Sequence, residues 1–227
     1  AARVLREKNP LSEVCGVICP AERFCERNCS RLDFDNKAVR IRDLHGWVCG
    51  HVSRSRGGDR WIPAQNGPKV AVVGAGPAGL ACAHYLARLG YGVDMMDKAS
   101  KPGGMLNHAI PAFRLGDDVV QREIEGLTVP GMRFHGGKAL GEDFTVEDLE
   151  GDYQAVFLAP GLWSGQQLEI PGANKTEAAD ALGFLKECRT SGTPRVGKKV
   201  LVTGGGSVAS DAALSAKHFG AAQVTLL

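Results

Sequence analysis

The chain has 227 residues, enough for one large domain or two small ones, and 44% of them are hydrophobic, which is ample for a buried core. A formal net charge of +2 gives no reason to expect nucleic acid or a membrane surface as a partner. No apolar run is long enough to span a bilayer, and the charged N-terminus does not resemble a signal peptide, so we expect a soluble, cytoplasmic protein.

The first element is expected to be the end of a helix over residues 1–9, which Pro10 stops. A chain that opens inside a helix is expected to continue upstream. Four of the seven cysteines then fall within 15 residues, in the pattern Cys-x3-Cys-Pro-x4-Cys-x3-Cys, at Cys15, Cys19, Cys25 and Cys29. In an intracellular chain such a group binds metal more often than it forms disulfides.

The cysteine pattern favours iron–sulfur clusters. Thiolates hold such clusters, and a proline beside a ligand cysteine recurs in ferredoxin-type sequences. Zinc prefers two separated Cys-x2-Cys pairs, which are absent here. Zinc and reduced structural thiols remain as alternatives, and the four cysteines could serve one cluster or be shared between two.

Residues 37–53 have the period of an amphipathic helix, whose expected core-facing residues are Val39, Leu44, Trp47 and Val48. His45 and Cys49 stand one turn apart on this helix. Such a pair can chelate a metal, but it more often reflects packing. Residues 53–67 are polar and rich in Gly and Pro, as expected for a linker.

The next stretch, to Asp97, has the order strand, glycine turn, helix, strand and acid. Gly74 permits a tight turn, Gly76 lets the backbone approach a pyrophosphate, and Gly79 allows the helix to pack closely on the strand. The phosphates would sit at the helix N-terminus, and the acid would bind the ribose hydroxyls. We therefore predict a dinucleotide site, with a tight turn that holds no ligand as the alternative.

A second glycine pair, at residues 103–104, leaves room for the middle of such a cofactor and for its ring. Arg114 could neutralise phosphate or orient the ring, and a surface loop with an exposed arginine is the alternative. Helices are expected at 117–128 and, capped by Thr145, at 145–150; strands are expected at 132–135 and 155–158.

Residues 199–227 repeat the theme of strand, Gly-x-Gly-x-x-Ala turn, helix and strand. Two such fingerprints in one chain predict two dinucleotides, with electrons passing between them. The setting of Ser207 also resembles a hydrolase nucleophile elbow, but Ala209 replaces the last glycine of that motif and no His-Gly-Gly-Gly segment precedes it. The residue that separates NAD from NADP would follow Leu227, so the sequence does not choose between them.

Together these motifs resemble the glutamate synthase small (β) subunit family, which includes the N-terminal half of dihydropyrimidine dehydrogenase. The resemblance covers nearly the whole chain. It is carried by the cysteine run and by matching stretches at residues 74–80, 103–106, 110–115, 155–161, 170–172 and 204–211.

The resemblance implies an α/β, two-dinucleotide-binding (Rossmann-like) flavoprotein fold, truncated, behind a small α-helical iron–sulfur domain. The expected parts are a 4Fe-4S cluster domain at 1–55, a linker at 56–68, an FAD-binding domain at 69–190 and the start of an NAD(P)H-binding domain at 191–227.

The family's binding residues map onto three groups. The resemblance implies FAD contacts at Gly74, Ala75, Gly76, Pro77, Ala78, Gly79, Asp97, Gly104, Met105 and Arg114. It implies NAD(P)H contacts at Gly204, Gly205, Gly206, Ser207, Val208 and Ala209. It implies cluster ligands at Cys19, Cys25 and Cys29, with His45 at the position where a glutamine completes one cluster in dihydropyrimidine dehydrogenase.

The implied function is electron input: NAD(P)H reduces FAD, and clusters pass electrons to a large subunit or fused domain. The chemistry belongs to the cofactors, so no side chain need act as a general acid or base. Pro160 departs from the Thr or Ser expected near the flavin. It favours the rival hypothesis, an electron-transfer or scaffold module that keeps the fold without oxidising NAD(P)H.

Overall fold

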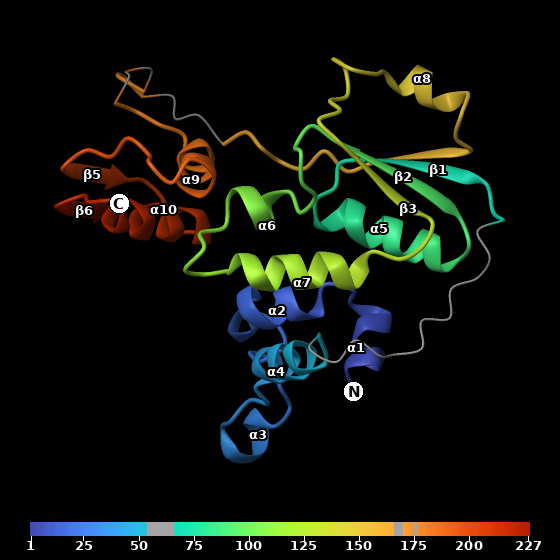
Figure 1. Ribbon diagram of the computed structural model, residues 1–227. Helices are drawn as coiled ribbons and strands as arrows, with labels where there is room; N and C mark the ends of the chain where they lie inside the picture. The colour runs from blue at the N-terminus through green and yellow to red at the C-terminus, as the bar shows by residue number, and fades with distance from the viewer. Residues whose placement is uncertain (54–65, 166–169, 174, 176) are drawn as a thin grey trace. The chain divides into compact units, whose positions relative to one another are not determined.

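A computed structural model describes residues 1–53, 66–165, 170–173, 175 and 177–227. The predicted linker lies outside these residues, apart from its last three positions. The described chain divides into two compact units, which are treated separately below (Figure 1). The first comprises Ala1–Gly104 and Arg114–Pro160; the second comprises Met105–Phe113 and Gly161–Leu227.

The first unit contains a parallel four-stranded sheet with the order β3-β2-β1-β4. Its strands are β1 (Lys69–Val73), β2 (Gly92–Asp97), β3 (Met132–Gly136) and β4 (Ala155–Leu158). Each parallel step needs a crossover connection. The crossovers contain α5 (Pro77–Arg88), α7 (Asp117–Leu127) and α8 (Val146–Glu150). The strands β3 and β4 and the helices α7 and α8 agree with the predicted ranges to within one residue at each end, and β1, α5 and β2 follow in the predicted order.

Alternation along the strands divides the core between the two faces of the sheet. Val72, Val93 and Met95 pack against Leu80, Ala83 and Ala87 of α5 and against Leu127 at the end of α7. On the other face, Ala71, Val73 and Met96 pack against Leu149 of α8. As predicted, Thr145 caps α8, in a reciprocal capping box with Asp148.

A buried acid, Asp94, also lies on the α8 face of β2. Its carboxylate accepts hydrogen bonds from Arg133 at 2.6 and 3.0 Å, from Tyr153 at 2.9 Å, and faces His135 Nε2 at 3.2 Å. Burial by itself raises the pKa of Asp94, but these hydrogen bonds outweigh it and leave the pKa below its ordinary value. These partners therefore stabilise Asp94 in its ionised form.

The N-terminal residues form a helical subdomain of the first unit. It contains α1 (Ala2–Lys8), α2 (Ser12–Ile18), the short 3-10 turn η1 (Ala21–Arg23), α3 (Leu32–Asp35) and α4 (Ile41–Ser53). The predicted helix at 1–9 is confirmed. The helices α2 and α4 cross at Gly16 and Gly46, where a Cβ added to Gly16 would lie 2.3 Å from the Gly46 backbone nitrogen. This crossing tolerates no side chain at Gly16.

The predicted core-facing side of α4 is wrong. Leu44 and Trp47 are 52% and 64% exposed, Val39 lies before the helix, and Val48 is half-buried. The face that packs on α2 contains Gly46, and Cys49 on α4 is fully buried. The helices approach through glycine, which carries no hydrophobic signal, so the apolar period pointed to the wrong side.

The second unit contains a parallel pair of strands, β5 (Lys199–Val202) and β6 (Gln223–Leu226), joined by α10 (Ser207–His218). Two further helices, α6 (Met105–His108) and α9 (Ala181–Thr190), belong to this unit. Within the ranges that the structure covers, none of the helices combines the length and apolar character needed to span a membrane.

Candidate dinucleotide and cluster sites

The first glycine turn joins β1 to α5 with very close backbone contacts. Gly74 has φ +100°, and a Cβ there would lie 2.0 Å from the carbonyl oxygen of Ala159. A Cβ on Gly79 would lie 1.8 Å from the carbonyl oxygen of Gly74. Gly76 is the N-cap of α5, and Pro77 begins the helix. No side chain caps the N-terminus of α5, and the glycines leave its backbone open to a phosphate group.

Asp97 at the end of β2 is tied to this turn. One carboxylate oxygen accepts the N–H of Ala75 at 2.7 Å, and the other accepts the N–H of Ala99 at 2.8 Å. Each carboxylate oxygen can accept more than one hydrogen bond, so both retain capacity for a hydroxyl donor. The predicted ribose acid thus lies directly beside the predicted phosphate turn.

The second glycine pair packs against the first turn. The N–H of Gly103 donates to the carbonyl of Ala75 at 2.7 Å, and a Cβ on Gly104 would lie 2.7 Å from Cα of Gly76. Arg114 is half-buried in a turn of the same unit. Met105 begins α6 and belongs to the second unit. The structure therefore brings together residues 74–79, Asp97 and Gly104 among the predicted FAD residues.

The second glycine turn has the same form between β5 and α10. Gly204 has φ +118°, Gly206 is the N-cap of α10, and a Cβ on Gly205 or Gly206 would meet no atom within 4 Å. Ser207 and Val208 are exposed, whereas Ala209 is buried and packs near Gly204. The turn thus leaves open backbone at a helix N-terminus, which fits a nucleotide phosphate.

The hydrolase alternative finds no support in the backbone. A nucleophile elbow holds its serine in a strained strand-to-helix turn. Among the residues that the structure describes, Asn36 is the sole non-glycine residue with positive φ, and Ser207 simply begins α10.

Two of the four clustered cysteines lie at the C-terminal part of α2, and the other two follow it in the chain. Cys15 lies on α2, Cys19 is the C-cap residue that follows it, Cys25 is exposed in the next loop, and the Cys29 sulfur accepts the N–H of Val39 at 3.5 Å. Burial raises the pKa of the Cys19 thiol, and the neighbouring Cys15 and Cys25 raise it further, while Arg42 opposes the shift. All four are free thiols, the form from which cluster ligands arise.

The backbone of His45 lies at the helix crossing, where a Cβ on Gly16 would lie 3.0 Å from the His45 carbonyl carbon. No three His, Cys, Asp or Glu side chains converge as a metal site, however, within the part of the chain that the structure describes. Thiol and imidazole groups are suitable ligands for an iron–sulfur cluster, but these side chains do not converge on one point in this structure.

Sequence reasoning missed Arg42, which stands beside the cysteine run. Its guanidinium donates to the Cys19 carbonyl at 3.4 Å and lies 3.5 Å from the Glu22 carboxylate, while its backbone N–H donates to Glu26 at 3.4 Å. Arg42 lies in a predicted helix 23 residues from Cys19, and nothing in the sequence pattern indicated that the two would be in contact.

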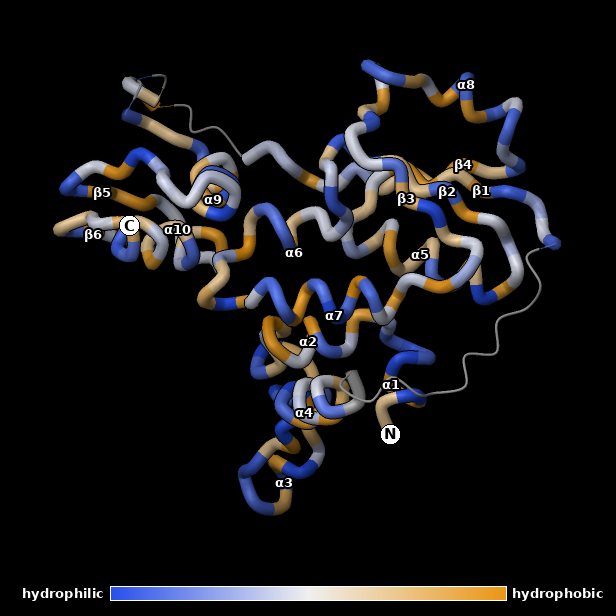
Figure 2. The backbone as a smooth tube through the Cα atoms, viewed as in Figure 1, coloured by the Kyte–Doolittle hydropathy of each residue, from blue (hydrophilic) through white to orange (hydrophobic). Residues whose placement is uncertain are grey.

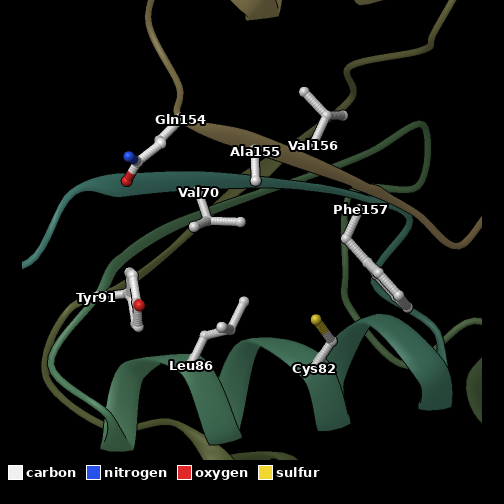
Figure 3. A pocket seen from close by; sticks show the side chains of 8 residues that line it. All are labelled: Val70, Cys82, Leu86, Tyr91, Gln154, Ala155, Val156 and Phe157. Carbon is white, nitrogen blue, oxygen red and sulfur yellow. The ribbon is translucent and has the colours of Figure 1, made fainter.

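A hollow between α5 and β4 is separate from these sites. Figure 3 shows Cys82 and Leu86 projecting from α5 toward Ala155 and Phe157 of β4. Its lining contains no charged side chain and none of the glycines of the turn. Its lining is mostly apolar, with Tyr91 and Gln154 as the polar side chains.

Two curated relatives match nearly the whole chain. The glutamate synthase (NADPH) small chain of Escherichia coli is 36% identical, over 99% of this chain and 50% of that protein. The NAD-dependent dihydropyrimidine dehydrogenase subunit PreT of Salmonella typhimurium is 34% identical, over 99% of this chain and 54% of that protein. The chain thus spans about half the length of these relatives, and the predicted resemblance is confirmed.

A solved structure supports the fold. Mycobacterium tuberculosis FprA in complex with NADPH matches with a TM-score of 0.58 and 25% identity, over 63% of this chain and 35% of that chain. The expected Rossmann-like flavoprotein fold is confirmed.

Two family models cover the chain in succession. Residues 1–56 match dihydropyrimidine dehydrogenase domain II with its 4Fe-4S cluster. Residues 68–227 match the pyridine nucleotide-disulphide oxidoreductases. These matches imply a 4Fe-4S cluster domain together with FAD and NAD(P)H binding, as predicted. The second match covers well over half of the sequence, so the chain belongs to the pyridine nucleotide-disulphide oxidoreductase family.

Proposed function

We propose that this chain is the electron-input part of a larger oxidoreductase, in which NAD(P)H passes a hydride to FAD and 4Fe-4S clusters carry single electrons to a partner subunit or fused domain. The observation that carries the proposal is the cradle formed by Gly74, Gly76, Gly79 and Gly104 beside Asp97. A second glycine turn and a run of free thiols occur in the same chain.

In this proposal the first unit binds the FAD phosphates at the N-terminus of α5, through the backbone of residues 74–79. Asp97 has both oxygens fixed by backbone N–H groups, so its carboxylate is pre-oriented for the ribose hydroxyls. Gly104 lets the next segment of backbone pass close to the turn, and Arg114 supplies positive charge for phosphate or ring. Met105 is the remaining proposed FAD contact.

The proposed NAD(P)H contacts are the backbone of Gly204, Gly205 and Gly206 and the first turn of α10, with Ser207, Val208 and Ala209. The proposed cluster ligands are Cys19, Cys25, Cys29 and His45. A histidine ligand would raise the potential of its cluster, as it does in Rieske centres. Domain roles follow the predicted boundaries: clusters at 1–55, FAD at 69–190 and nicotinamide from 191.

The nucleotide and the electron acceptor stay open within this proposal. One relative is named for NADPH and the other for NAD, and both names describe subunits of larger enzymes. We propose a large subunit or fused domain as acceptor. A cytoplasmic location is part of the proposal, because all seven cysteines are free, as expected in a reducing compartment.

An anaerobic titration of the full-length protein with NADH and NADPH, followed by visible absorbance, tests this function. We expect the flavin bands to bleach with at least one nucleotide, above a broad iron–sulfur shoulder, and the preferred nucleotide identifies the cofactor. Full-length protein with bound flavin that neither nucleotide reduces would instead favour the scaffold or electron-transfer module. Pro160 is the sequence feature behind that second candidate.

A further inference from the structure

The helix α2, which leads into the cysteine run, has no side-chain cap of its own. Its N-cap residue is Leu11, and the Ser12 hydroxyl at its start instead donates to the Asn9 carbonyl. The first N–H groups of a helix need partners from outside the helix. The N–H of Val14 finds one 109 residues away, donating to Glu123 Oε2 at 2.7 Å.

Glu123 reaches this position from the buried face of α7, between Val120 and Leu127. Figure 2 shows hydrophilic and hydrophobic segments alternating along α7, as expected for an amphipathic helix with one buried side. The Glu123 residue is only 2% exposed, and the N–H of Glu13 also bonds to its carboxylate. Glu123 therefore supplies from α7 the cap that α2 lacks.

Other charged groups complete the contact around Glu123. Arg6 of α1 attracts its carboxylate and also donates to the Cys49 carbonyl of α4 at 3.4 Å. Glu13 of α2 repels it, but Glu13 is itself paired with Arg122 of α7 at 2.8 Å. Groups from α1, α2, α4 and α7 thus lie around the Glu123 carboxylate. Arg6 and Arg122 balance the charges of the two acids, Glu123 and Glu13.

Burial dominates the titration of Glu123 and raises its pKa to about 7. If α2 moved off α7, the carboxyl group would return to water and to an ordinary glutamate pKa. The docked arrangement therefore binds a proton more tightly than the undocked one. By linkage, docking is favoured at low pH, and it weakens as the pH rises toward the pKa that Glu123 has in the docked state.

We propose that Glu123 is a positioning residue that docks the N-terminus of α2 onto α7, and that this docking takes up a proton. The contact orients α2, which contains Cys15 and is followed directly by Cys19, relative to α7 of the same unit. Its importance for electron transfer rests on the proposed function, whereas the docking itself does not.

Hydrogen exchange of the α2 peptide in the full-length protein tests the proposal at pH 6 and pH 8, after correction for the intrinsic pH dependence of amide exchange. Linkage between the raised pKa of Glu123 in the docked state and its ordinary pKa in the undocked state predicts about tenfold more opening of the Glu13 and Val14 amides at pH 8 than at pH 6. Burial raises the pKa of the Cys49 thiol, so it stays protonated over this range, and guanidinium groups do not titrate there.

The variant Glu123→Gln keeps the shape and one acceptor but cannot titrate, so its corrected exchange should be the same at both pH values. The matched control is Glu125→Gln on the exposed side of α7, where Glu125 pairs with Gln121 at 2.9 Å. It should keep the tenfold change. Equal protection of wild type at both pH values, or identical behaviour of the two variants, would overturn the proposal. The measurement needs no nucleotide, so its outcome is independent of flavin reduction.

Discussion

Gly79→Ala is expected to abolish FAD binding and to destabilise the first unit, whereas Gly126→Ala leaves both properties intact. The new methyl group at position 79 would lie 1.8 Å from the Gly74 carbonyl oxygen, so α5 must move away from β1. Because the obstacle is backbone, we expect a loss of about 3 kcal/mol or more, at the upper end of overpacking effects. The displacement also moves the N-terminus of α5 away from Asp97 and Gly104.

Gly126 makes a fair control because it also lies within a helix, α7, where an added Cβ would meet nothing within 4 Å. Alanine there should be neutral or should stabilise the helix by up to about 1 kcal/mol. Urea unfolding and the flavin content of the purified full-length protein measure both properties. Normal flavin content and stability in Gly79→Ala would contradict the close packing described for this turn.

Gly16→Ala is expected to reduce the iron and sulfide content of the protein severely. A Cβ on Gly16 would meet the Gly46 backbone nitrogen at 2.3 Å, which forces α2 and α4 apart. Cys15 lies on α2, Cys19 is the C-cap residue of α2, and His45 lies on α4, so the separation of the cysteines from His45 changes directly. Flexible side chains cannot relieve this clash, because both contacting groups are backbone.

The matched control for this crossing is Gly50→Ala on α4. The nearest atom to a Cβ there is Glu13 Oε1 at 3.7 Å, an ordinary contact. We expect normal iron and sulfide content per chain in this variant. Equal iron content in Gly16→Ala and wild type would show that the crossing does not control the geometry of the cysteine run.

The sequence predicted the sheet of the first unit well because local signals coincide there. Between Lys69 and Asp97, the apolar run predicts a strand, the three glycines predict the turn into a helix, and the acid marks the end of the second strand. The structure contains all of these features in the predicted order. The second fingerprint was equally clear, since β5, α10 and β6 repeat the same order.

Contacts between distant segments were harder to predict. The inward face of α4 was misjudged because its packing depends on Gly46, whereas Leu44 and Trp47 carry the hydrophobic signal. Short helices such as α6 have too few residues to show a period. The sequence does show that Glu123 is an acid on the otherwise apolar face of α7, but its partner Val14 is 109 residues away. Sequence spacing contains no information about such a pairing.

The most direct test of the proposed electron path is an electron paramagnetic resonance spectrum of the full-length protein after anaerobic reduction by NADH or NADPH. We predict flavin bleaching together with signals of reduced 4Fe-4S clusters in wild type. Cys25→Ser, at an exposed position, should keep the bleaching and lose cluster signal, whereas Cys82→Ser, in the sheet domain, should keep both. Cluster signals that are unchanged in Cys25→Ser, or wild-type flavin that no nucleotide bleaches, would contradict the proposed path.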